Sequence, residues 1–411
     1  MRPAACLLLF LAVVACSAAP PQQAPAAAAG PKASPIVVLV SLDGWRWDYL
    51  DRANAPNLRA LAMRGVKAEA LVPVFPSKTF PVHYTIVTGL YPEHHGIIGN
   101  VISDPEIGSL FTMSSDTARD PRWWGGEPVW NTARRQGLRT ASMFWPGSDV
   151  AIGGQQPHDW RTYDRGVPNR DRVQQVLDWL GRPPPQRPSF VTLYFSDVDA
   201  AGHAAGPDSR DVLEAAARLD RLIGALVDGI ARLGLTAQTT IVVTSDHGMS
   251  AISRDRRIYL DDYVDRSRFT LQDSGPVVSI FPRRTTAQDL HRALAGRHPQ
   301  MTVYLRESIP ERLHYRAHPR IAPVVAVAAD GWTIVTRSVV SALRHEAGAH
   351  GYDPANRSMH GLFIAAGPAL REGVVVPSFE AVHVYALLCR LLGITPAAND
   401  GDPTVTAGMF K

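Results

Sequence analysis

Three continuous apolar runs, at residues 36–42, 190–195 and 240–244, indicate strands that are buried on both faces of a sheet. Between the second and third runs, in residues 211–233, apolar side chains recur every three or four positions, which is typical of an amphipathic helix. Buried strands that alternate with such helices predict an α/β fold, with a mostly parallel central sheet and helices on both of its faces.

The first 35 residues lie outside this pattern. Residues 1–19 begin with one basic residue, continue as an apolar run and end in small residues, which predicts a secretory signal peptide. Residues 13–16, VVAC, are similar to a bacterial lipobox, in which Cys16 would carry a lipid; ordinary cleavage near residues 17–19 is the alternative. Residues 20–35 are rich in proline and alanine and predict an extended linker. We expect an exported, periplasmic protein, whose only membrane attachment would be a lipid on Cys16.

Composition changes the picture in three ways. The chain of 411 residues is 45% hydrophobic and 19% charged, which suits a large core and excludes general disorder. Its net charge is +4, and it has no basic block or basic–aromatic stripe, which argues against nucleic acid as a structural partner. Three cysteines are too few for a disulfide framework, and we expect Cys389, in a helix-like run, to pack in the core.

Acidic and histidine residues follow all three predicted strands. Asp43 follows the first, Asp199 the second, and Asp246 with His247 the third, while His203 lies four residues after Asp199. Each alone has an ordinary explanation, as a helix cap, a turn residue or a surface histidine. The carboxyl ends of parallel strands meet at one sheet edge, where so many carboxylates would repel one another without a cation. Mixed Asp and His ligands favour zinc over manganese or iron, and disfavour calcium and magnesium.

The segment 72–100 contains a candidate nucleophile. Thr79 lies between Pro76 and Pro81, at a predicted turn before the helix-like residues 83–88. A threonine hydroxyl is a poor nucleophile at neutral pH, and no serine-hydrolase type of elbow surrounds it. A metal bound directly to the hydroxyl oxygen could activate it.

These motifs, taken in order, resemble the nucleotide pyrophosphatase/phosphodiesterase family of the alkaline phosphatase superfamily, and the lipobox indicates a bacterial member. The resemblance covers residues 36–397. Its matching pieces are SLDG at 41–44, FPSKTFP at 75–81, GLYP at 89–92, GIIGN at 96–100, FWPGS at 144–148, Asp199 with Gly202 and His203, SDHG at 245–248, and HGYD at 350–353.

The resemblance implies an alkaline phosphatase-like α/β/α sandwich and two zinc ions. It places one zinc on Asp43, Thr79, Asp246 and His247, and the other on Asp199, His203 and a distal histidine. The HGYD motif favours His350 over His360 for that last ligand. We expect one catalytic domain over residues 36–411, with a small cap or insertion around residues 255–345; no pattern predicts the oligomeric state.

The family mechanism also implies roles for the side chains of Thr79, Asn100, Phe80 and Tyr163 and for one backbone N–H. Thr79 would form a covalent phosphothreonine, while Asn100, and the backbone N–H of Thr79 or Phe80, would donate to a phosphate oxygen. Phe80 and Tyr163 match positions that stack a nucleobase, although a core or turn role for either is the ordinary alternative.

The charge of the implied site bears on the substrate. Three aspartates and a threonine alkoxide would balance two zinc ions, so a singly charged diester suits the site better than a doubly charged monoester. The neighbouring cation Lys78 weakens this argument. We expect hydrolysis of phosphodiester or pyrophosphate bonds in nucleotides and related small-molecule diesters, with lipid-headgroup diesters left open. A phosphomonoesterase of the same superfamily and an inactive metal-binding lipoprotein are the competing hypotheses.

Overall fold

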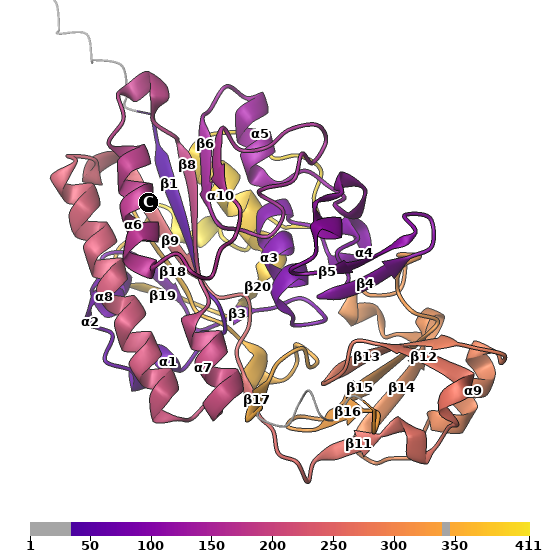
Figure 1. Ribbon diagram of the computed structural model, residues 1–411. Coiled ribbons are helices and arrows are strands. Elements are labelled where there is room, and N and C mark those ends of the chain that lie inside the picture. Colours follow the sequence, from indigo (N-terminus) through magenta and orange to yellow (C-terminus); the bar gives the residue numbers. More distant parts are fainter. Residues whose placement is uncertain (1–33, 339–345) are drawn as a thin grey trace, which may run out of the picture. The chain divides into compact units, whose positions relative to one another are not determined.

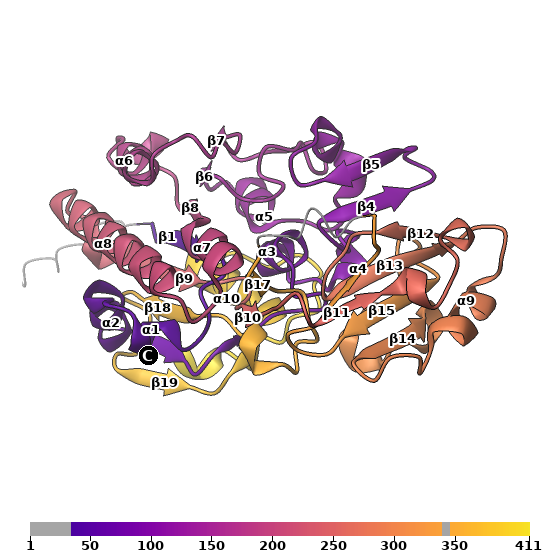
Figure 2. The same ribbon diagram turned by 60° about the horizontal axis from the view of Figure 1, so that its bottom comes forward.

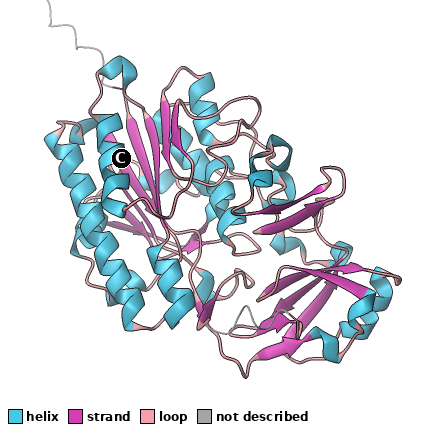
Figure 3. Cartoon of the chain, in the orientation of Figure 1, coloured by secondary structure: helices cyan, strands magenta, loops and turns pink. Residues whose placement is uncertain are grey.

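The structure is a computed structural model that describes residues 34–338 and 346–411. The predicted signal peptide and lipobox, and nearly all of the predicted linker, lie outside the described residues. An eight-stranded sheet forms the centre, in the order β19-β2-β18-β9-β1-β8-β6-β7 (Figures 1 and 3). None of the helices in the described ranges is long and apolar enough to cross a membrane.

The three strands predicted from apolar runs lie side by side in the middle of this sheet. β1 (Ile36–Leu42) pairs in parallel with β8 (Phe190–Phe195) on one side and with β9 (Thr239–Thr244) on the other. All seven residues of β1 are buried, because helices cover both faces. The carboxyl ends of these strands therefore lie together at one sheet edge.

The remaining strands extend the sheet on both sides. β6 (Thr140–Met143) and β7 (Asp159–Arg161) continue it in parallel beyond β8. On the other side, β18 (Phe363–Ala366) runs antiparallel to β9 and is followed by β2 (Val66–Ala68) and β19 (Val374–Val376). The sheet is mixed but mostly parallel, and the predicted α/β fold is confirmed.

Helices on the two faces build separate cores. Alternate residues of β1 point to opposite sides, so Val38 and Val40 join one core and Val37 and Leu39 the other. The Val38 side is covered by α1 (Tyr49–Arg52), α2 (Pro56–Met63), α6 (Asn169–Leu180), α7 (Asp197–Ala205) and α8 (Arg210–Arg232). Figure 2 shows α2 and α8 side by side.

The opposite face is covered by α3 (Thr79–Thr88), α5 (Val129–Arg135) and α10 (Val384–Leu392), with α4 (Pro92–His95) beside α3. Cys389 is fully buried in α10, as predicted, and burial raises the pKa of its thiol to about 12. Short paired strands complete this part: β3 (Leu71–Val72) with β20 (Phe379–Glu380), and β4 (Val101–Asp104) with β5 (Ser109–Thr112).

The segment predicted as an insertion forms a second, antiparallel sheet with its own core. Its strands have the order β12 (Phe269–Gln272), β13 (Val277–Pro282), β15 (Val324–Ala328), β14 (Met301–Leu305), and α9 (Ala287–Leu294) packs against them. β11 (Arg257–Tyr259) pairs with β16 (Thr333–Val335) beside this sheet. β10 (Ser250–Ala251) and β17 (Gly348–Ala349) pair where the chain leaves and re-enters the main fold.

Candidate active site

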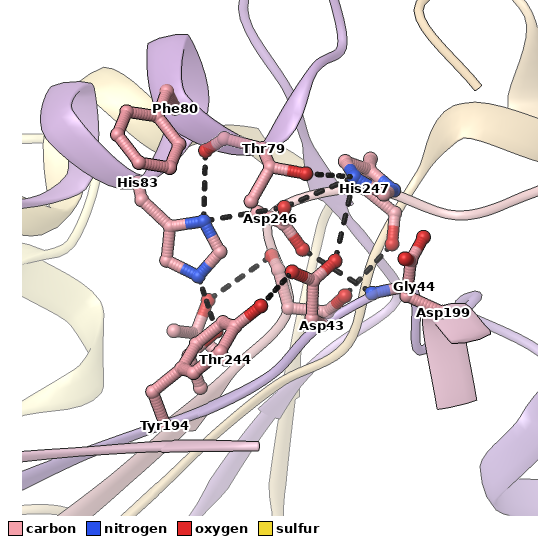
Figure 4. A network of polar contacts seen from close by, with 12 residues as sticks. Asp43, Gly44, Thr79, Phe80, His83, Tyr194, Asp199, Thr244, Asp246 and His247 are labelled. Carbon is pink, nitrogen blue, oxygen red and sulfur yellow. Dashed lines mark hydrogen bonds and ion pairs between the residues drawn. The ribbon is translucent and has the colours of Figure 1, made fainter. Parts of the chain in front are cut away.

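The carboxyl ends of the three central strands bring Asp43, Asp199, Asp246 and His247 together (Figure 4). Asp43 directly follows β1, and Asp199 lies in the first turn of α7 after β8. Asp246 follows β9 after one intervening residue. Gly44 permits this close packing, because a Cβ there would lie 2.7 Å from the Cα of Asp199, and its φ is +69°. The backbone N–H of Asp199 donates to the carbonyl of Asp43 at 3.0 Å, which joins β1 to α7.

The first cluster consists of Asp43, Asp246 and His247, all buried, with one ligand atom of each within 4.8 Å of the others. His247 Nε2 lies 3.0 Å from Asp246 Oδ2 and 3.5 Å from Asp43 Oδ1. The hydroxyl of Thr79 lies 3.4 Å from the same Nε2 atom. The structure thus brings together the four residues that the resemblance assigns to the first ion.

The second cluster consists of Asp199, His203 and His350. The Nε2 atoms of His203 and His350 lie 3.4 and 3.6 Å from Asp199 Oδ1. The His350 ring also stacks on His247, with 3.5 Å between centroids, so the two clusters adjoin. His360 lies outside both clusters and contacts the carbonyl of Pro354 instead. Of the two competing histidines, the structure therefore places His350 with the other ligands.

The three histidines of the clusters share one orientation. In His247, His203 and His350, Nδ1 lies 2.9 Å from a backbone carbonyl, of Gly248, Gly348 and Ser77 respectively. A carbonyl can only accept, so each Nδ1 carries the proton and each Nε2 keeps a free lone pair. All three lone pairs face the carboxylates, which is how metal-binding histidines are held by their surroundings.

The three aspartates complement these histidines. Asp43 Oδ1, Asp199 Oδ1 and Asp246 Oδ2 are buried and have no hydrogen-bond partner anywhere in the described parts of the chain. The second oxygen is held in two of them: Tyr194 donates to Asp43 Oδ2 at 2.6 Å, and the Gly44 N–H donates to Asp246 Oδ1 at 3.3 Å. Buried carboxylate oxygens without partners are unfavourable unless a cation binds them. The donor set therefore fits two metal ions.

Electrostatics lead to the same conclusion. Burial raises the pKa of Asp43 well above its usual range, and the charges of Asp246 and Asp199 raise it further. Burial opposes ionisation of Asp246 as well, but His247 and His83 outweigh it and hold the pKa of Asp246 well below normal. Burial, with the neighbouring His247, lowers the pKa of His350. Cations between these groups would relieve the repulsion among the carboxylates.

The predicted nucleophile begins a helix. Thr79 is the first residue of α3, is 9% exposed, and lies at the positive end of the helix dipole. The backbone N–H of Phe80, one of the two phosphate donors that we expected, donates to Asn100 Oδ1 at 3.0 Å. This N–H is engaged by Asn100 in the structure, and its role as a phosphate donor stays a prediction. The Asn100 amide nitrogen has no hydrogen bond within the described residues and is free to donate.

Lys78 is engaged by the insertion. Its ammonium pairs with Asp273, in the turn between β12 and β13, and also donates to the carbonyl of Val277 at 3.4 Å. The Lys78 side chain is only 8% exposed, so little solvent screens this pair. The charge of Lys78, beside Thr79, is therefore neutralised by Asp273. Lys78 is then not available to balance the second negative charge of a monoester, so the charge of the site still favours a diester.

The two predicted base-stacking residues both adjoin the clusters. Phe80, next to the nucleophile, is half-buried and packs against the rings of Phe111 and Trp124, with centroids 5.6 and 6.1 Å away. Tyr163 is 45% exposed and contacts the ring of Tyr194 with 5.8 Å between centroids. Because Tyr194 also bonds Asp43, its contact with Tyr163 joins the exposed aromatic ring to the first cluster.

Two residues of the site, Tyr194 and His83, were not predicted from the sequence. Tyr194 lies opposite Ser41 in the parallel register of β8 and β1, next to the end of the strand that carries Asp43. This register is a tertiary property that the apolar run does not reveal. His83 lies four residues after Thr79 on the same face of α3, but the predicted helix-like segment began only at residue 83, so the sequence did not reveal this relation.

Comparison with known proteins shows which family the chain belongs to. The chain belongs to the type I phosphodiesterase/nucleotide pyrophosphatase family, whose pattern matches residues 37–353. It is 40% identical over 383 residues to a venom phosphodiesterase of Crotalus durissus collilineatus, covering 90% of this chain and 46% of the relative. It is 38% identical over 371 residues to a bis(5'-adenosyl)-triphosphatase of Xenopus laevis, covering 90% of this chain and 80% of the relative.

A solved structure extends the likeness to three dimensions. The inactive threonine-to-alanine variant of murine ectonucleotide pyrophosphatase/phosphodiesterase 5, in complex with AMP, superposes with a TM-score of 0.87 at 36% identity. The match covers 92% of this chain and 100% of that chain. The family predicted from the motifs is confirmed. The chain spans about half the length of the venom relatives, and the relatives named here are animal proteins, so the bacterial origin stays a prediction.

Proposed function

We propose that this protein is a zinc-dependent phosphodiesterase and nucleotide pyrophosphatase. The observation that carries the proposal is the convergence of three free Nε2 lone pairs and three unpartnered carboxylate oxygens beside Thr79. One zinc would be held by Asp43, Thr79, Asp246 and His247, and the other by Asp199, His203 and His350. The names of the relatives, a phosphodiesterase and a dinucleoside triphosphatase, support the reaction class.

Thr79 carries the chemistry of the chain itself. Two zinc ions held by the two clusters would supply positive charge to the attacking and leaving oxygens of a phosphoryl transfer. Thr79 Oγ1 loses its proton to solvent and attacks phosphorus in line. A phosphothreonine ester forms as the bond to the leaving alcohol or phosphate breaks, and the leaving group takes up a proton from solvent. Water then hydrolyses this ester and restores the hydroxyl. The Asn100 amide donates to a non-bridging oxygen, whose negative charge grows during each displacement.

Charge and aromatic contacts define the preferred substrate. With Lys78 neutralised by Asp273, no free cation among the described residues adjoins Thr79 to balance the second charge of a monoester, which favours a diester or a pyrophosphate. Phe80 and Tyr163 offer ring faces and edges for a nucleobase without specifying which one. The AMP bound to the murine relative supports a nucleotide as the small-molecule substrate.

We also propose that the protein acts outside the cytoplasm. The apolar N-terminal run supports export, with the protein in the periplasm and a lipid on Cys16 as its membrane attachment. The descriptions of relatives as venom and ectonucleotide enzymes are consistent with an exported protein.

The test compares kcat/KM for bis(4-nitrophenyl) phosphate and 4-nitrophenyl phosphate, with residues 17–411 assayed in zinc. We expect the diester to be preferred. Thr79→Ala should lower the diester rate by at least about a thousandfold, whereas Thr79→Ser, which keeps a hydroxyl, should retain part of it. A monoester preference would assign the protein to the phosphomonoesterases. No turnover of either ester, with zinc bound, would favour the inactive metal-binding lipoprotein.

A further inference from the structure

A chain of buried polar contacts runs behind the two clusters and meets at His83 (Figure 4). His83 Nε2 lies 2.7 Å from the hydroxyl of Ser41, in β1. His83 Nδ1 lies 2.8 Å from the carbonyl oxygen of Thr79 and 3.2 Å from Asp246 Oδ2. Ser41 and His83 are fully buried and Asp246 is 1% exposed. One imidazole thus contacts the nucleophilic residue, a cluster carboxylate and the central strand.

The order of these contacts, from hydroxyl to Nε2 and from Nδ1 to carboxylate, is that of a serine-hydrolase triad. Its position excludes that use, because Ser41 is 0% exposed inside the sheet and cannot meet a substrate. The hydroxyl that is accessible beside the clusters belongs to Thr79. We therefore expect the contacts of His83 to affect Thr79 and the neighbouring Asp246 rather than to activate Ser41.

The chemistry of the partners fixes the proton of His83. Nδ1 faces a carbonyl and a carboxylate, which only accept, so Nδ1 carries the hydrogen. In the neutral ring, Nε2 then accepts from the hydroxyl of Ser41. This N–H donates to the carbonyl of Thr79, whereas Asp246 Oδ2, an oxygen that we assign to the first metal ion, lies 3.2 Å from the same nitrogen as an ion-pair contact and accepts no hydrogen bond.

The ring of His83 is also held in place. The rings of Trp145 and Tyr194 meet it edge to face, with centroids 5.0 and 5.4 Å away and interplanar angles of 77° and 71°. The Trp145 indole N–H donates to the His83 backbone carbonyl at 3.1 Å. A fully buried ring in contact with two other rings cannot turn without displacing them, so Nδ1 stays directed at the carbonyl of Thr79.

We propose that His83, oriented by Ser41, is a positioning residue that fixes Asp246 Oδ2 relative to Thr79. The inference deepens the proposed function and rests on it, because it concerns the same metal centre. Partners that orient a metal ligand typically contribute about 10- to 100-fold to metal affinity. Loss of the His83 N–H should weaken zinc at the first cluster by that factor and leave the second cluster unchanged.

The experiment measures zinc retained after dialysis against graded dipicolinate, in two backgrounds. Asp199→Asn leaves the first cluster as the intact site, and Asp246→Asn leaves the second. His83→Leu should release zinc at about 10- to 100-fold lower chelator concentration in the first background and at the same concentration in the second. His83→Asn places an amide N–H near the position of Nδ1 and should restore most of the retention. Ser41→Ala should also lower the chelator concentration at which the first background releases zinc, but by less than His83→Leu does.

A matched control separates positioning from loss of fold. His95 is also fully buried and bonded to a threonine, at 3.0 Å from Thr85 Oγ1, but it belongs to neither cluster. His95→Leu should lower the melting temperature of the metal-free protein without changing zinc release in either background. Equal weakening of both clusters by His83→Leu, or no weakening of the first, would overturn the inference.

The outcomes also separate this inference from the proposed function. Wild-type protein that holds two zinc ions but hydrolyses no diester would refute the function, and the comparison of variants would still test His83. Active wild-type protein, with His83→Leu retaining zinc like its parent, would refute only the inference. Wild-type protein that binds no zinc would overturn both.

Discussion

At the scale of single residues, the phenol of Tyr194 has the clearest consequence for activity. It donates to Asp43 Oδ2 and thereby leaves Oδ1 directed at the first cluster. Tyr194→Phe removes only this donor. We expect kcat for bis(4-nitrophenyl) phosphate to fall about tenfold, and the free energy of unfolding to fall by about 1–3 kcal/mol, because a buried acceptor loses its partner.

Tyr385→Phe is the matched control for this measurement. The Tyr385 hydroxyl is also buried and lies 2.8 Å from Thr132 Oγ1, on α10 and away from both clusters. It should lower stability by a similar amount and leave kcat unchanged. Equal kcat values for wild-type protein and Tyr194→Phe would show that Asp43 keeps its orientation without the phenol.

Residues differed in how far the sequence could predict them. Asp43, Asp246 and His247 were predictable because they immediately follow apolar runs, which mark the ends of buried strands. Tyr194 was not, because its role depends on which strand lies beside which. His350 was predicted only through the family motif, since the whole insertion separates it from the other ligands in sequence.

At the scale of elements, the insertion acts on the site through one ion pair. Asp273, between β12 and β13, neutralises Lys78 beside the nucleophile. Asp273→Asn removes the negative charge and leaves the ammonium to balance a second phosphate charge. We expect kcat/KM for 4-nitrophenyl phosphate to rise about three- to tenfold relative to the diester, as measured in parallel assays.

The double variant Asp273→Asn/Lys78→Met tests the cause of this change. It also removes the cation, so the ratio of monoester to diester turnover should return toward the wild-type value. A ratio that is the same in wild-type protein and in Asp273→Asn would mean that Lys78 does not influence the substrate charge.

Elements also differed in how well their sequences predicted them. The central strands are long, apolar and buried on both faces, and α8 has a continuous apolar stripe, so both were evident from their patterns. Of the insertion's strands, β12, β13 and β14 are only partly buried whereas β15 is buried throughout, and between them lie turns and arginine-rich stretches. Such short alternating patterns indicate a cap without fixing its strand order, because antiparallel pairing is decided by contacts distant in sequence.

At the scale of the whole molecule, the buried His95 and the half-buried His318, both outside the clusters, predict acid sensitivity. Burial lowers the pKa of His95 to about 3 and that of His318 to about 4. His95 must stay neutral, because its Nδ1 accepts from the backbone N–H of Ile97 at 3.1 Å. The unfolded chain, with histidine pKa values of about 6.5, binds protons that the folded chain does not. Stability is therefore complete above about pH 6.5 and is lost as the pH falls toward 4 and 3.

Urea unfolding of the metal-free protein between pH 7.5 and 5 measures this effect. His95→Asn keeps an acceptor for the Ile97 N–H but does not titrate. It should flatten the pH dependence of the unfolding free energy by up to about 1.4 kcal/mol per pH unit, the value for one proton. The same slope in both proteins would assign the acid sensitivity to other groups.

The spacing of the ligands along the chain also determines when the centre can exist. The first cluster draws on residues from Asp43 to His247, whereas the second requires His350, which follows the whole insertion. During synthesis, a chain that ends before His350 could complete the first cluster but not the second. Contacts between residues so distant in sequence form late in folding. The proposed two-metal site would therefore assemble only after nearly the entire fold is in place, and a chain that ends before His350 would hold at most one of the two proposed ions.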